Sequence, residues 1–455
     1  MSDFPDTLRD RNVCIMGLGY VGLTLAVVMA DVGFRIHGVE IRESVVRSLE
    51  RGDPHFHEPG LAGRLARVLK SGRLSVSQHI PGDMEASVYV VTVGTPLDKD
   101  GKVRVSMIIN VVREIAHHLK DGDMVVMRST VELGTTRNVV KPILVATGRR
   151  YDVVFCPERT LEGQALRELR ELPQIVGGHD RDSRIRAAQV FQFLTPTVVQ
   201  VSSLETAELI KLIDNAQRDV HFGLSNEVAR IADAIGVSAV EVIRAGKLGY
   251  ARTNLAMPGP VGGPCLEKDS YILANGLKGF EIAPEIIMAA RRTNERQPAE
   301  TVAQLRTFCL RMAFPTAPVI TLAGIAFKGR PETDDLRGTM AKPILAALRQ
   351  SFPDGQFRGF DPVVTAQTIR DTFQLHPVAS IADAFAGSHL VVIANNHPCF
   401  ERMPLSALAE TMARPAVIFD FWNNFGAANV ELPAGVTYTG LGELGRTARE
   451  LEAVC

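Results

Sequence analysis

The sequence predicts a protein of the α/β class, in which two doubly wound Rossmann-like domains are joined by a central helical region with one long helix. Three observations lead to this prediction. A glycine-rich turn follows the first apolar segment, strand-like and helical segments alternate at both ends of the chain, and a long stretch of helical periodicity separates these ends. The length of 455 residues suits about three domains. We place them at 1–200, 201–314 and 315–455.

The first predicted domain begins with a β-α-β unit. Residues 12–16 are expected to form a short buried strand, a helix follows the glycine turn through about Val32, and residues 34–40 form a second strand. A connection of this kind makes the two strands parallel, with a right-handed crossover. Further strands of this domain are expected at 87–93, 123–128, 151–156 and 174–177.

The central region is expected to be mostly helical. From Ser203 to about Gly236, apolar residues recur at helical spacing without a proline, which predicts one long helix with a bend near Gly223. A Gly/Pro-rich loop follows at 246–264, and the helical pattern resumes over 284–313. The β-α-β rhythm then returns, with strands expected at 318–323, 357–360, 389–394 and 416–420.

Composition and charge exclude several classes of function. The 50 Lys and Arg residues are balanced by 51 Asp and Glu, so the basic footprint of a nucleic-acid-binding protein is absent at the level of the whole chain. Six cysteines without a C-x-x-C pair argue against a disulfide scaffold or a structural metal, and favour a reducing, cytoplasmic location. The uncharged stretch 13–30 contains three glycines and is expected to be a strand, turn and helix rather than a membrane span.

Residues 17–22 (GLGYVG) have the G-x-G-x-x-G spacing of a dinucleotide-binding turn between a strand and a helix. The spacing allows a tight turn, close approach of a pyrophosphate, and close helix-to-strand packing. The expected contacts are Gly17, Gly19, Tyr20, Val21 and Gly22. Glu40, at the end of the second strand, favours NAD over NADP because a carboxylate binds a ribose hydroxyl and repels a 2′-phosphate, although Arg42 lies nearby. The alternative is a glycine-rich helix start without a ligand.

Residues 262–269 (GGPCLEKD) are the strongest candidate for chemistry. A helix that begins at Pro264 or Cys265 would place Cys265 and Asp269 on one face. A cysteine at a helix N-terminus has a lowered pKa and is a usable nucleophile. The alternative is a small buried side chain, which suits the other five cysteines better than one in a Gly/Pro-rich loop beside charges.

Polar side chains gather at two further places. Lys211, Asn215 and Arg218 share one face of the predicted long helix and suit an anionic or oxyanion-bearing ligand, although such a face is more often only solvated. Another group follows strand ends along one sheet edge, where open α/β sheets bind ligands. This group comprises Thr95, Thr130, Glu158 and Arg159.

Together these motifs resemble the UDP-glucose/GDP-mannose dehydrogenase family over nearly the full chain. The matching segments are GLGYVG (17–22), EPGL (58–61), GTP (94–96), STV (129–131), GTT (134–136), PER (157–159), K-x-x-x-N (211–215), GPVGGPCLEKD (259–269) and AFK…DDLR (326–337). Family members oxidise the C6 hydroxymethyl of a nucleotide sugar to a carboxylate with two NAD⁺. The resemblance therefore implies an NAD-dependent oxidoreductase with a UDP-sugar substrate, whose product enters polysaccharide biosynthesis.

The resemblance also implies roles for individual residues. Cys265 would add to the aldehyde from the first oxidation, and the resulting thiohemiacetal would be oxidised to a thioester that water hydrolyses. Lys211 would stabilise the oxyanion or move the first proton, with Asn215 assisting. Asp269 and Glu158 would hold or activate water.

Other contacts follow from the same resemblance. Thr130 would position water or nicotinamide, and the identity of the general base stays open. The remaining cofactor contacts implied are Glu40, Thr95 and Arg337. The substrate contacts implied are Arg159, Lys211, Asn215, Arg218, Tyr250, Arg252, Gly262 and Lys328. The central helices of the family commonly form dimers, so a homodimer or larger homo-oligomer is expected.

Within the family, the sequence is more similar to the UDP-N-acetylhexosamine branch. Arg159 stands where the UDP-glucose branch usually has Phe, and the segment 250–252 resembles the UDP-N-acetylmannosamine enzymes. Two departures are Tyr250 for the branch's frequent His and Trp422 for the family's common Arg. We expect UDP-N-acetylmannosamine or another UDP-N-acetylhexosamine as the substrate, with UDP-glucose as the alternative.

Two other functions are compatible with parts of the pattern. A two-electron 3-hydroxyacid dehydrogenase would share the Rossmann domain and the K-x-x-x-N helix, but it needs neither the cysteine nor a second α/β domain. A non-catalytic NAD- or nucleotide-binding regulator would explain Trp422. No nucleic-acid, metal or membrane partner is expected.

Overall fold

The computed structural model describes residues 9–98, 101–425 and 431–454. The chain divides into two compact units, one formed by Met1–Asn215 with Tyr271–Ala283 and the other by Ala216–Ser270 with Pro284–Cys455. The boundary passes through the long helix α8 (Leu204–Ile235). The division into three domains at 200 and 314 stays a prediction.

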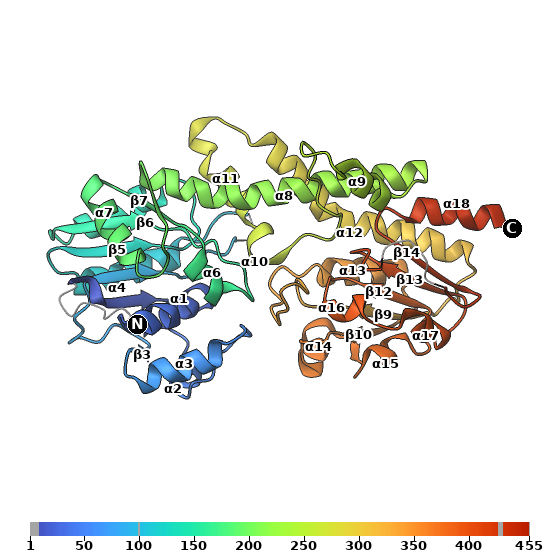
Figure 1. The fold of residues 1–455 in the computed structure, drawn as a ribbon, viewed down its shortest axis with the longest axis horizontal. Helices are drawn as coiled ribbons and strands as arrows, with labels where there is room; N and C mark the ends of the chain where they lie inside the picture. The colour runs from blue at the N-terminus through green and yellow to red at the C-terminus, as the bar shows by residue number, and fades with distance from the viewer. Residues whose placement is uncertain (1–8, 99–100, 426–430, 455) are drawn as a thin grey trace. The chain divides into compact units, whose positions relative to one another are not determined.

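The first unit contains an eight-stranded sheet in the order β3-β2-β1-β4-β5-β6-β7-β8 (Figure 1). Neighbouring strands are parallel except β6 and β7, which pair antiparallel. The order reverses beside β1, and open α/β sheets bind ligands at such a point, outside the carboxyl ends of the strands. The strands are β1 (Asn12–Met16), β2 (Arg35–Val39), β3 (Leu74–Ser77), β4 (Val88–Val91), β5 (Asp123–Met127), β6 (Tyr151–Phe155), β7 (Gln174–Gly178) and β8 (Val198–Val201).

Helices cover both faces of this sheet. One face packs on α1 (Tyr20–Val32), α3 (Leu61–Lys70), α6 (Ala165–Glu171) and α7 (Arg181–Phe191). The other packs on α4 (Ser106–His118), α5 (Lys141–Val145) and the start of α8. The unit also contains η1 (Arg9–Arg11), α2 (Glu43–Glu50), the π-helical turn η2 (Thr136–Val140) and η3 (Lys278–Phe280).

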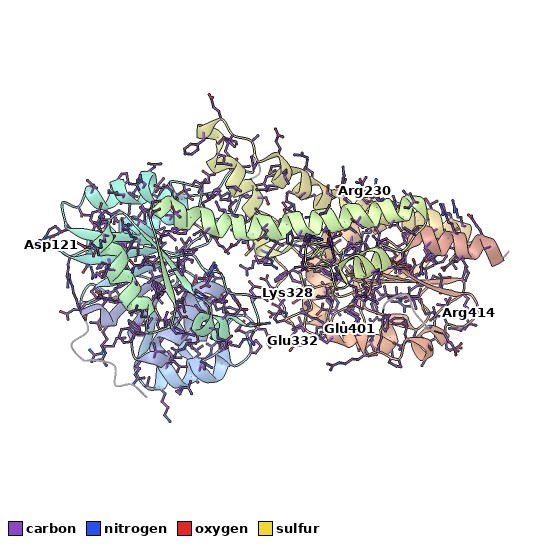
Figure 2. The ribbon with its side chains drawn as sticks, turned by 45° about the horizontal axis from the view of Figure 1, so that its top comes forward. Asp121, Arg230, Lys328, Glu332, Glu401 and Arg414 are labelled. Carbon is purple, nitrogen blue, oxygen red and sulfur yellow. The ribbon has the colours of Figure 1, made fainter. Side chains whose placement is uncertain are left out.

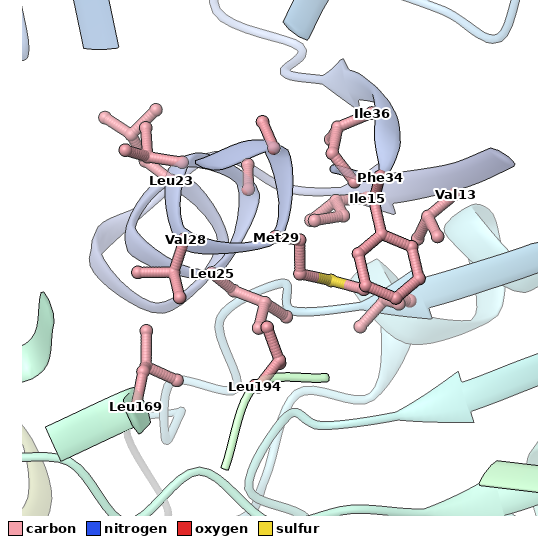
Figure 3. Packing of buried hydrophobic residues seen from close by; sticks show 14 of the residues in the cluster. Val13, Ile15, Leu23, Leu25, Val28, Met29, Phe34, Ile36, Leu169 and Leu194 are labelled. Carbon is pink, nitrogen blue, oxygen red and sulfur yellow. The ribbon is translucent and has the colours of Figure 1, made fainter. Parts of the chain in front are cut away.

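Helix α1 is apolar on nearly all sides because it is buried between the sheet and other helices. Figure 3 shows Leu25 and Met29 of α1 among Val13, Ile15 and Leu194. Burial of each such side chain contributes roughly 1.5–3 kcal/mol. The uncharged stretch that contains α1 is therefore core, and the carboxyl end of β1 and the start of α1 are fixed in place.

The second unit contains a six-stranded, fully parallel sheet in the order β11-β10-β9-β12-β13-β14. Its strands are β9 (Val319–Ala323), β10 (Gln356–Phe360), β11 (His376–Pro377), β12 (Leu390–Ile393), β13 (Ala416–Asp420) and β14 (Val436–Gly440). Its helices are α9 (Ala239–Lys247), α10 (Gly263–Leu266), α12 (Glu285–Arg311), α13 (Ala341–Ser351), α14 (Ala366–Phe373), α15 (Ile381–Phe385), α16 (Pro398–Glu401), α17 (Leu405–Glu410) and α18 (Leu444–Val454), and α11 (Asp269–Gly276) begins in it. Buried clusters on both faces make this sheet doubly wound as well.

The predicted fold class is confirmed, and the differences are local. Four strands, β3, β8, β11 and β14, were not predicted, because they are short or lie at sheet edges and carry polar residues. Helix α8 continues without interruption through Gly223. A Cβ at Gly223 would lie 2.7 Å from the Cβ of Ala290 on α12, so close helix packing accounts for this glycine. No helix within the described ranges is long and apolar enough to cross a bilayer.

Candidate active site

The glycine turn after β1 is shaped for a phosphate ligand. Gly17 has φ +95°, which favours glycine, and its N–H donates to the Val39 carbonyl at 2.8 Å. A Cβ at Gly22 would lie 1.9 Å from the Gly17 carbonyl oxygen, so only glycine fits there. Apart from its chain neighbours, no described residue has an atom within 4 Å of a Cβ at Gly19, the N-cap of the 13-residue helix α1. The turn therefore leaves open space at a helix N-terminus, as pyrophosphate binding requires.

Glu40 follows β2 and is buried beside this turn. It accepts a hydrogen bond from Leu18 N at 3.2 Å and a charge-assisted one from Arg42 Nε at 2.8 Å. Burial alone would raise the pKa of Glu40, but the hydrogen bonds from Arg42 outweigh it and the pKa is lowered. Glu40 is thus an anion at neutral pH, which suits a ribose hydroxyl.

The EPGL segment is anchored to the glycine turn by Glu58, a residue to which sequence analysis gave no role. The Tyr20 hydroxyl donates to Glu58. Glu58 also accepts the N–H groups of Gly163 at 2.6 Å and Ala165 at 2.9 Å, at the start of α6. Burial and the hydrogen bond to Glu58 raise the pKa of Tyr20, so the phenol stays protonated. Three segments distant in sequence therefore meet beside the dinucleotide turn.

Two of the predicted strand-end residues are in contact. The Thr95 hydroxyl donates to the Thr130 carbonyl at 2.6 Å, since β4 and β5 are neighbours in the sheet. The following GTT segment is held by Glu208 of α8, which accepts from Gly134 N at 2.6 Å and from the Thr136 hydroxyl at 2.6 Å. Glu208 was not predicted, because its partners lie 72 and 74 residues earlier in the chain.

Glu158 is buried and saturated with hydrogen bonds. Its Oε2 accepts from Arg128 Nη2 at 2.7 Å and Nε at 3.1 Å, and its Oε1 accepts from Arg159 N at 2.8 Å and Thr160 N at 2.9 Å. Burial alone would raise the pKa of Glu158, but the Arg128 charge and these hydrogen bonds lower it. The carboxylate is therefore ionised, and its lone pairs are largely used.

Arg159, another predicted residue of the first unit, contacts helix α8 and the residue that precedes β7. Arg159 Nη2 donates to the Pro173 carbonyl at 2.8 Å, and Arg159 Nη1 lies 3.4 Å from Asp214 of α8. Lys211 and Asn215 are one turn apart on α8 and belong to the first unit, whereas Arg218 belongs to the second. All three residues lie on α8, at the helical spacing that was predicted for them.

The second unit carries Cys265, which is exposed, whereas Cys14, Cys156 and Cys309 are buried. The prediction of one helix under Cys265 and Asp269 is wrong. α10 has four residues, starts at Gly263 and ends at Leu266, and Asp269 begins the separate helix α11. The chain turns at residues 267–268, so the i, i+4 relation on a continuous helix does not apply.

The two glycines before the cysteine allow close packing on the loop after β9. Gly263 has φ +89°, and its N–H donates to the Gly338 carbonyl at 2.7 Å. A Cβ at Gly262 would lie 2.2 Å from that carbonyl oxygen, and a Cβ at Gly263 would lie 2.6 Å from the Phe327 ring. Gly262, a predicted substrate contact, therefore packs against the loop that also carries Lys328 and Arg337.

A buried polar network supports the cysteine loop from beneath, and sequence analysis missed it. Arg291 of α12 donates to the Leu266 carbonyl at 2.7 Å and the Val261 carbonyl at 3.1 Å, and it pairs with Asp219 of α8 at 3.0 Å. Asp219 also accepts from Ser270 at 3.1 Å and Asn294 at 2.7 Å. The charged pair is fully buried. Its hydrogen bonds fix both ends of the segment around Cys265.

The same network reaches Gly259. Asn226 of α8 accepts from Gly259 N and donates to the Gly259 carbonyl, both at 3.0 Å. A Cβ at Gly259 would lie 2.9 Å from the Trp422 ring, which stacks edge-on against Phe222. Trp422 Nε1 donates to the Ala394 carbonyl at 3.0 Å, beyond β12. The tryptophan thus joins the carboxyl end of the second sheet to the cysteine loop.

The remaining predicted contacts are in the second unit. Lys328 Nζ lies 5.1 Å from the centre of the Phe327 ring, and Arg337 forms an ion pair with Asp335 at 2.6 Å. Figure 2 shows Lys328 at the opposite end of this unit from Arg414, which precedes β13. Arg252 stacks on the Tyr250 ring at 4.7 Å. The described residues contain no cluster of His, Cys, Asp or Glu able to hold a metal ion.

The first unit combines an open glycine turn at a helix N-terminus with an ionised carboxylate at the end of β2, and these two features define an NAD-binding domain. Comparison with known proteins agrees. Residues 11–195, 205–296 and 321–427 match the NAD binding domain, central domain and UDP binding domain of the UDP-glucose/GDP-mannose dehydrogenase family. The chain belongs to this family and is an NAD-dependent nucleotide-sugar dehydrogenase.

Individual relatives span the whole chain. The UDP-N-acetyl-D-mannosamine dehydrogenase of Pyrococcus horikoshii is 31% identical over 438 residues, which are 95% of this chain and 99% of that protein. The solved structure of the UDP-D-ManNAc dehydrogenase from P. horikoshii has a TM-score of 0.85 at 29% identity and covers 96% of this chain and all of that one. A UDP-glucose dehydrogenase from Pyrobaculum islandicum has a TM-score of 0.83 at 24% identity, covering 96% and 99%. That similarity shows the fold alone.

Proposed function

We propose that the enzyme oxidises the C6 hydroxymethyl of UDP-N-acetylmannosamine, or of another UDP-N-acetylhexosamine, to a carboxylate in a four-electron reaction. The name of the P. horikoshii relative, at 31% identity over nearly the full length, supports the choice of sugar. The observation that carries the reaction type is Cys265: it is exposed on a short helix whose last carbonyl, that of Leu266, accepts a hydrogen bond from a buried arginine. Such a cysteine suits covalent catalysis.

The residues that would hold the cofactor are those of the glycine turn, with Glu40 on the ribose. When bound, NAD supplies the acceptor for both hydrides. The first oxidation removes a hydride from C6, the proton of the C6 hydroxyl passes to water, and the product is an aldehyde. We assign Lys211, assisted by Asn215, to the developing oxyanion, because a cation and an amide on one helix face can donate to it together.

Cys265 then carries the substrate through the second oxidation. Its Sγ, as the thiolate, adds to C6, and the former carbonyl oxygen takes a proton to give the thiohemiacetal. Loss of that proton and of a second hydride from C6 leaves a thioester. Water adds to C6, the C–S bond breaks, and the carboxylic acid leaves while the thiolate is restored. One water is consumed for two hydrides removed.

The four hydrogen bonds to Glu158 favour an orienting role over that of a general base. An ionised carboxylate with a lowered pKa is a weak proton acceptor. We therefore assign Glu158 to holding the segment of Arg159 and Thr160 in place. Asp269, which is buried at the start of α11, and Thr130 are the proposed water-positioning groups.

We propose that the UDP moiety binds the second sheet's domain through Lys328, and that Arg337 reaches a phosphate of NAD or of the UDP moiety. Both cations lie within the stretch that matches the UDP binding domain. Arg337 is paired with Asp335, and its side chain is 61% exposed, so it remains accessible to a ligand. Tyr250, Arg252, Arg218 and Arg159 are proposed for the sugar. Trp422, in place of the family's common Arg, provides packing rather than a phosphate charge.

We also propose a homodimer formed through the central helices. Leu224, Ile231 and Ile235 are exposed on one side of α8, and Ile286 of α12 is 75% exposed. Apolar side chains at this spacing form a continuous stripe on a helix. Analytical ultracentrifugation is expected to show a dimer that Ile231→Glu weakens; a wild-type monomer at micromolar concentration would contradict it. The cytoplasmic location stays a prediction.

The sugar is tested by NADH absorbance with UDP-N-acetylmannosamine, UDP-N-acetylglucosamine, UDP-glucose and GDP-mannose. The expected result is two NADH per UDP-N-acetylmannosamine, with the highest kcat/KM in the panel. A higher kcat/KM for UDP-glucose would favour the alternative sugar. One NADH per sugar would point to a two-electron enzyme. Tight binding of a sugar without NADH production would point to a regulator.

A further inference from the structure

The carboxyl end of β2 carries a basic side chain that NAD binding does not need. Arg42 is two residues after Glu40, at the N-cap of α2. It contacts Glu40 through Nε at 2.8 Å, Nη2 at 3.2 Å and its backbone N–H at 3.1 Å. Dinucleotide folds read the adenosine 2′ position at this place, with a carboxylate for a hydroxyl or an arginine for a phosphate. Here both groups are present and paired.

The pair is unequally exposed. The Glu40 side chain is 6% exposed, whereas that of Arg42 is 55% exposed. A guanidinium has five N–H donors in a planar fork, so Arg42 can keep contact with Glu40 and still offer donors to a ligand. Of the two groups, only the Glu40 carboxylate repels a 2′-phosphate, because the phosphate would place a second anion close to it.

The imidazole of His55 is also near the pair. Burial, chiefly, lowers the pKa of His55. The nearby charge of Arg42 lowers it further, and the charge of Glu40 opposes this shift. Its Nδ1 is buried without a hydrogen-bond partner among the described residues. Around Glu40 there are therefore one carboxylate, an arginine with unused N–H donors, and an imidazole nitrogen without a hydrogen-bond partner among the described residues.

We propose that Arg42 is a second cofactor-specificity residue: the Glu40–Arg42 pair reads the adenosine 2′ substituent, and the preference for NAD over NADP depends on the single carboxylate of Glu40. Loss of that carboxylate converts the same place into a 2′-phosphate site in which Arg42 is the ligand. The proposal concerns dinucleotide binding only and does not depend on the identity of the sugar or on Cys265.

The test is the direct binding of NAD⁺ and NADP⁺, by isothermal calorimetry without sugar, to the full-length enzyme and three variants. Glu40→Gln removes the charge and keeps the shape. We expect the Kd ratio of the two dinucleotides to shift towards NADP by about 10- to 100-fold, the value of a charge-assisted contact. The double variant Glu40→Gln, Arg42→Gln is expected to bind NADP⁺ at least about tenfold more weakly than Glu40→Gln alone. Arg47→Gln, on the same helix but paired with Glu43, is the control and should match the wild type.

Equal NADP affinity of the single Glu40→Gln variant and the double variant would overturn the proposal, as would the absence of any shift in Glu40→Gln. Circular dichroism checks that each variant is folded. Should Glu40→Gln not fold, Arg42→Gln alone decides: it is expected to lower the affinity for NADP more than that for NAD, and an equal effect on both would refute the assignment. Because no turnover is measured, an error in the proposed sugar or mechanism leaves these results unaffected.

Discussion

The Arg291 guanidinium donates a 2.7 Å hydrogen bond to the carbonyl of Leu266, the last residue of the helix that carries Cys265. Arg291 is simultaneously paired with Asp219 at 3.0 Å, and both side chains are buried. Burial raises the pKa of Asp219 and the charge of Arg291 opposes that rise. The exposed cysteine is therefore positioned from the interior, by an ion pair between α8 and α12.

Removing one partner of this pair should cost much stability. Arg291→Met leaves the Asp219 carboxylate buried without its cation, and we expect a loss of about 3–5 kcal/mol in the free energy of unfolding. Urea denaturation monitored by circular dichroism measures it. Arg296→Met, on the same helix but about half exposed in its pair with Glu300, is the matched control and should change stability by less than about 1 kcal/mol. Equal effects of the two substitutions would contradict the importance of the buried pair.

Gly263, which precedes Pro264, is expected to be required for full turnover. In Gly263→Ala, the new Cβ meets the Phe327 ring at a positive φ of +89°, so the loop must move and turnover should fall at least about tenfold, since misplacement by 1 Å can cost about 100-fold. The NADH production rate reports it. Gly246→Ala on α9, where a Cβ would meet no described residue within 4 Å beyond the surrounding turns of its own helix, should leave the rate unchanged. An unchanged rate in Gly263→Ala would show that the close packing is not needed.

The second unit should become less stable as the pH rises through about 6. Burial raises the pKa of Asp420 from 3.8 to about 6, against hydrogen bonds from Trp422 and Asn424. The folded state therefore binds a proton that the unfolded state has released, so this stabilisation is complete below about pH 3.8 and is lost above pH 6. The difference amounts to roughly 3 kcal/mol.

The measurement is the urea unfolding free energy of the wild type minus that of Asp420→Asn, at intervals between pH 4 and 7. We expect this difference to fall with rising pH, because asparagine does not titrate. The wild type alone would not identify Asp420, since Asp233 also has a pKa raised to about 6, mainly by burial. Subtracting the unfolding free energy of Asp420→Asn removes the contribution of Asp233. A pH-independent difference would show that Asp420 titrates near its ordinary value.

Much of this site could be predicted because its signals are local. The glycine turn, Glu40 at the end of β2 and the cysteine between glycines and charges each follow from residues adjacent in sequence. The helix under Cys265 was mispredicted because the hydrophobic pattern does not show that the chain turns at 267–268. The short strands β3 and β8 were missed for a similar reason, since they are short and partly polar.

The supporting residues could not be predicted from spacing. Glu58 contacts Gly163, Glu208 contacts Thr136, and Arg291 contacts Leu266, and each pair is brought together only by the tertiary fold. A buried charge leaves no periodic pattern in the sequence, because a single arginine or glutamate on a helix is usually taken as a surface residue. These contacts nevertheless determine where the predicted residues lie.

The central claim is that Cys265 forms a covalent bond to C6. Its most direct test is the intact mass of Cys265→Ser after mixing with NAD⁺ and UDP-N-acetylmannosamine, with Cys399→Ser as the control. We predict that Cys265→Ser retains the sugar acid as a slowly hydrolysed ester and releases little product, whereas Cys399→Ser shows no adduct and forms two NADH per sugar. Release of the acid by Cys265→Ser at the wild-type rate, without an adduct, would contradict the account.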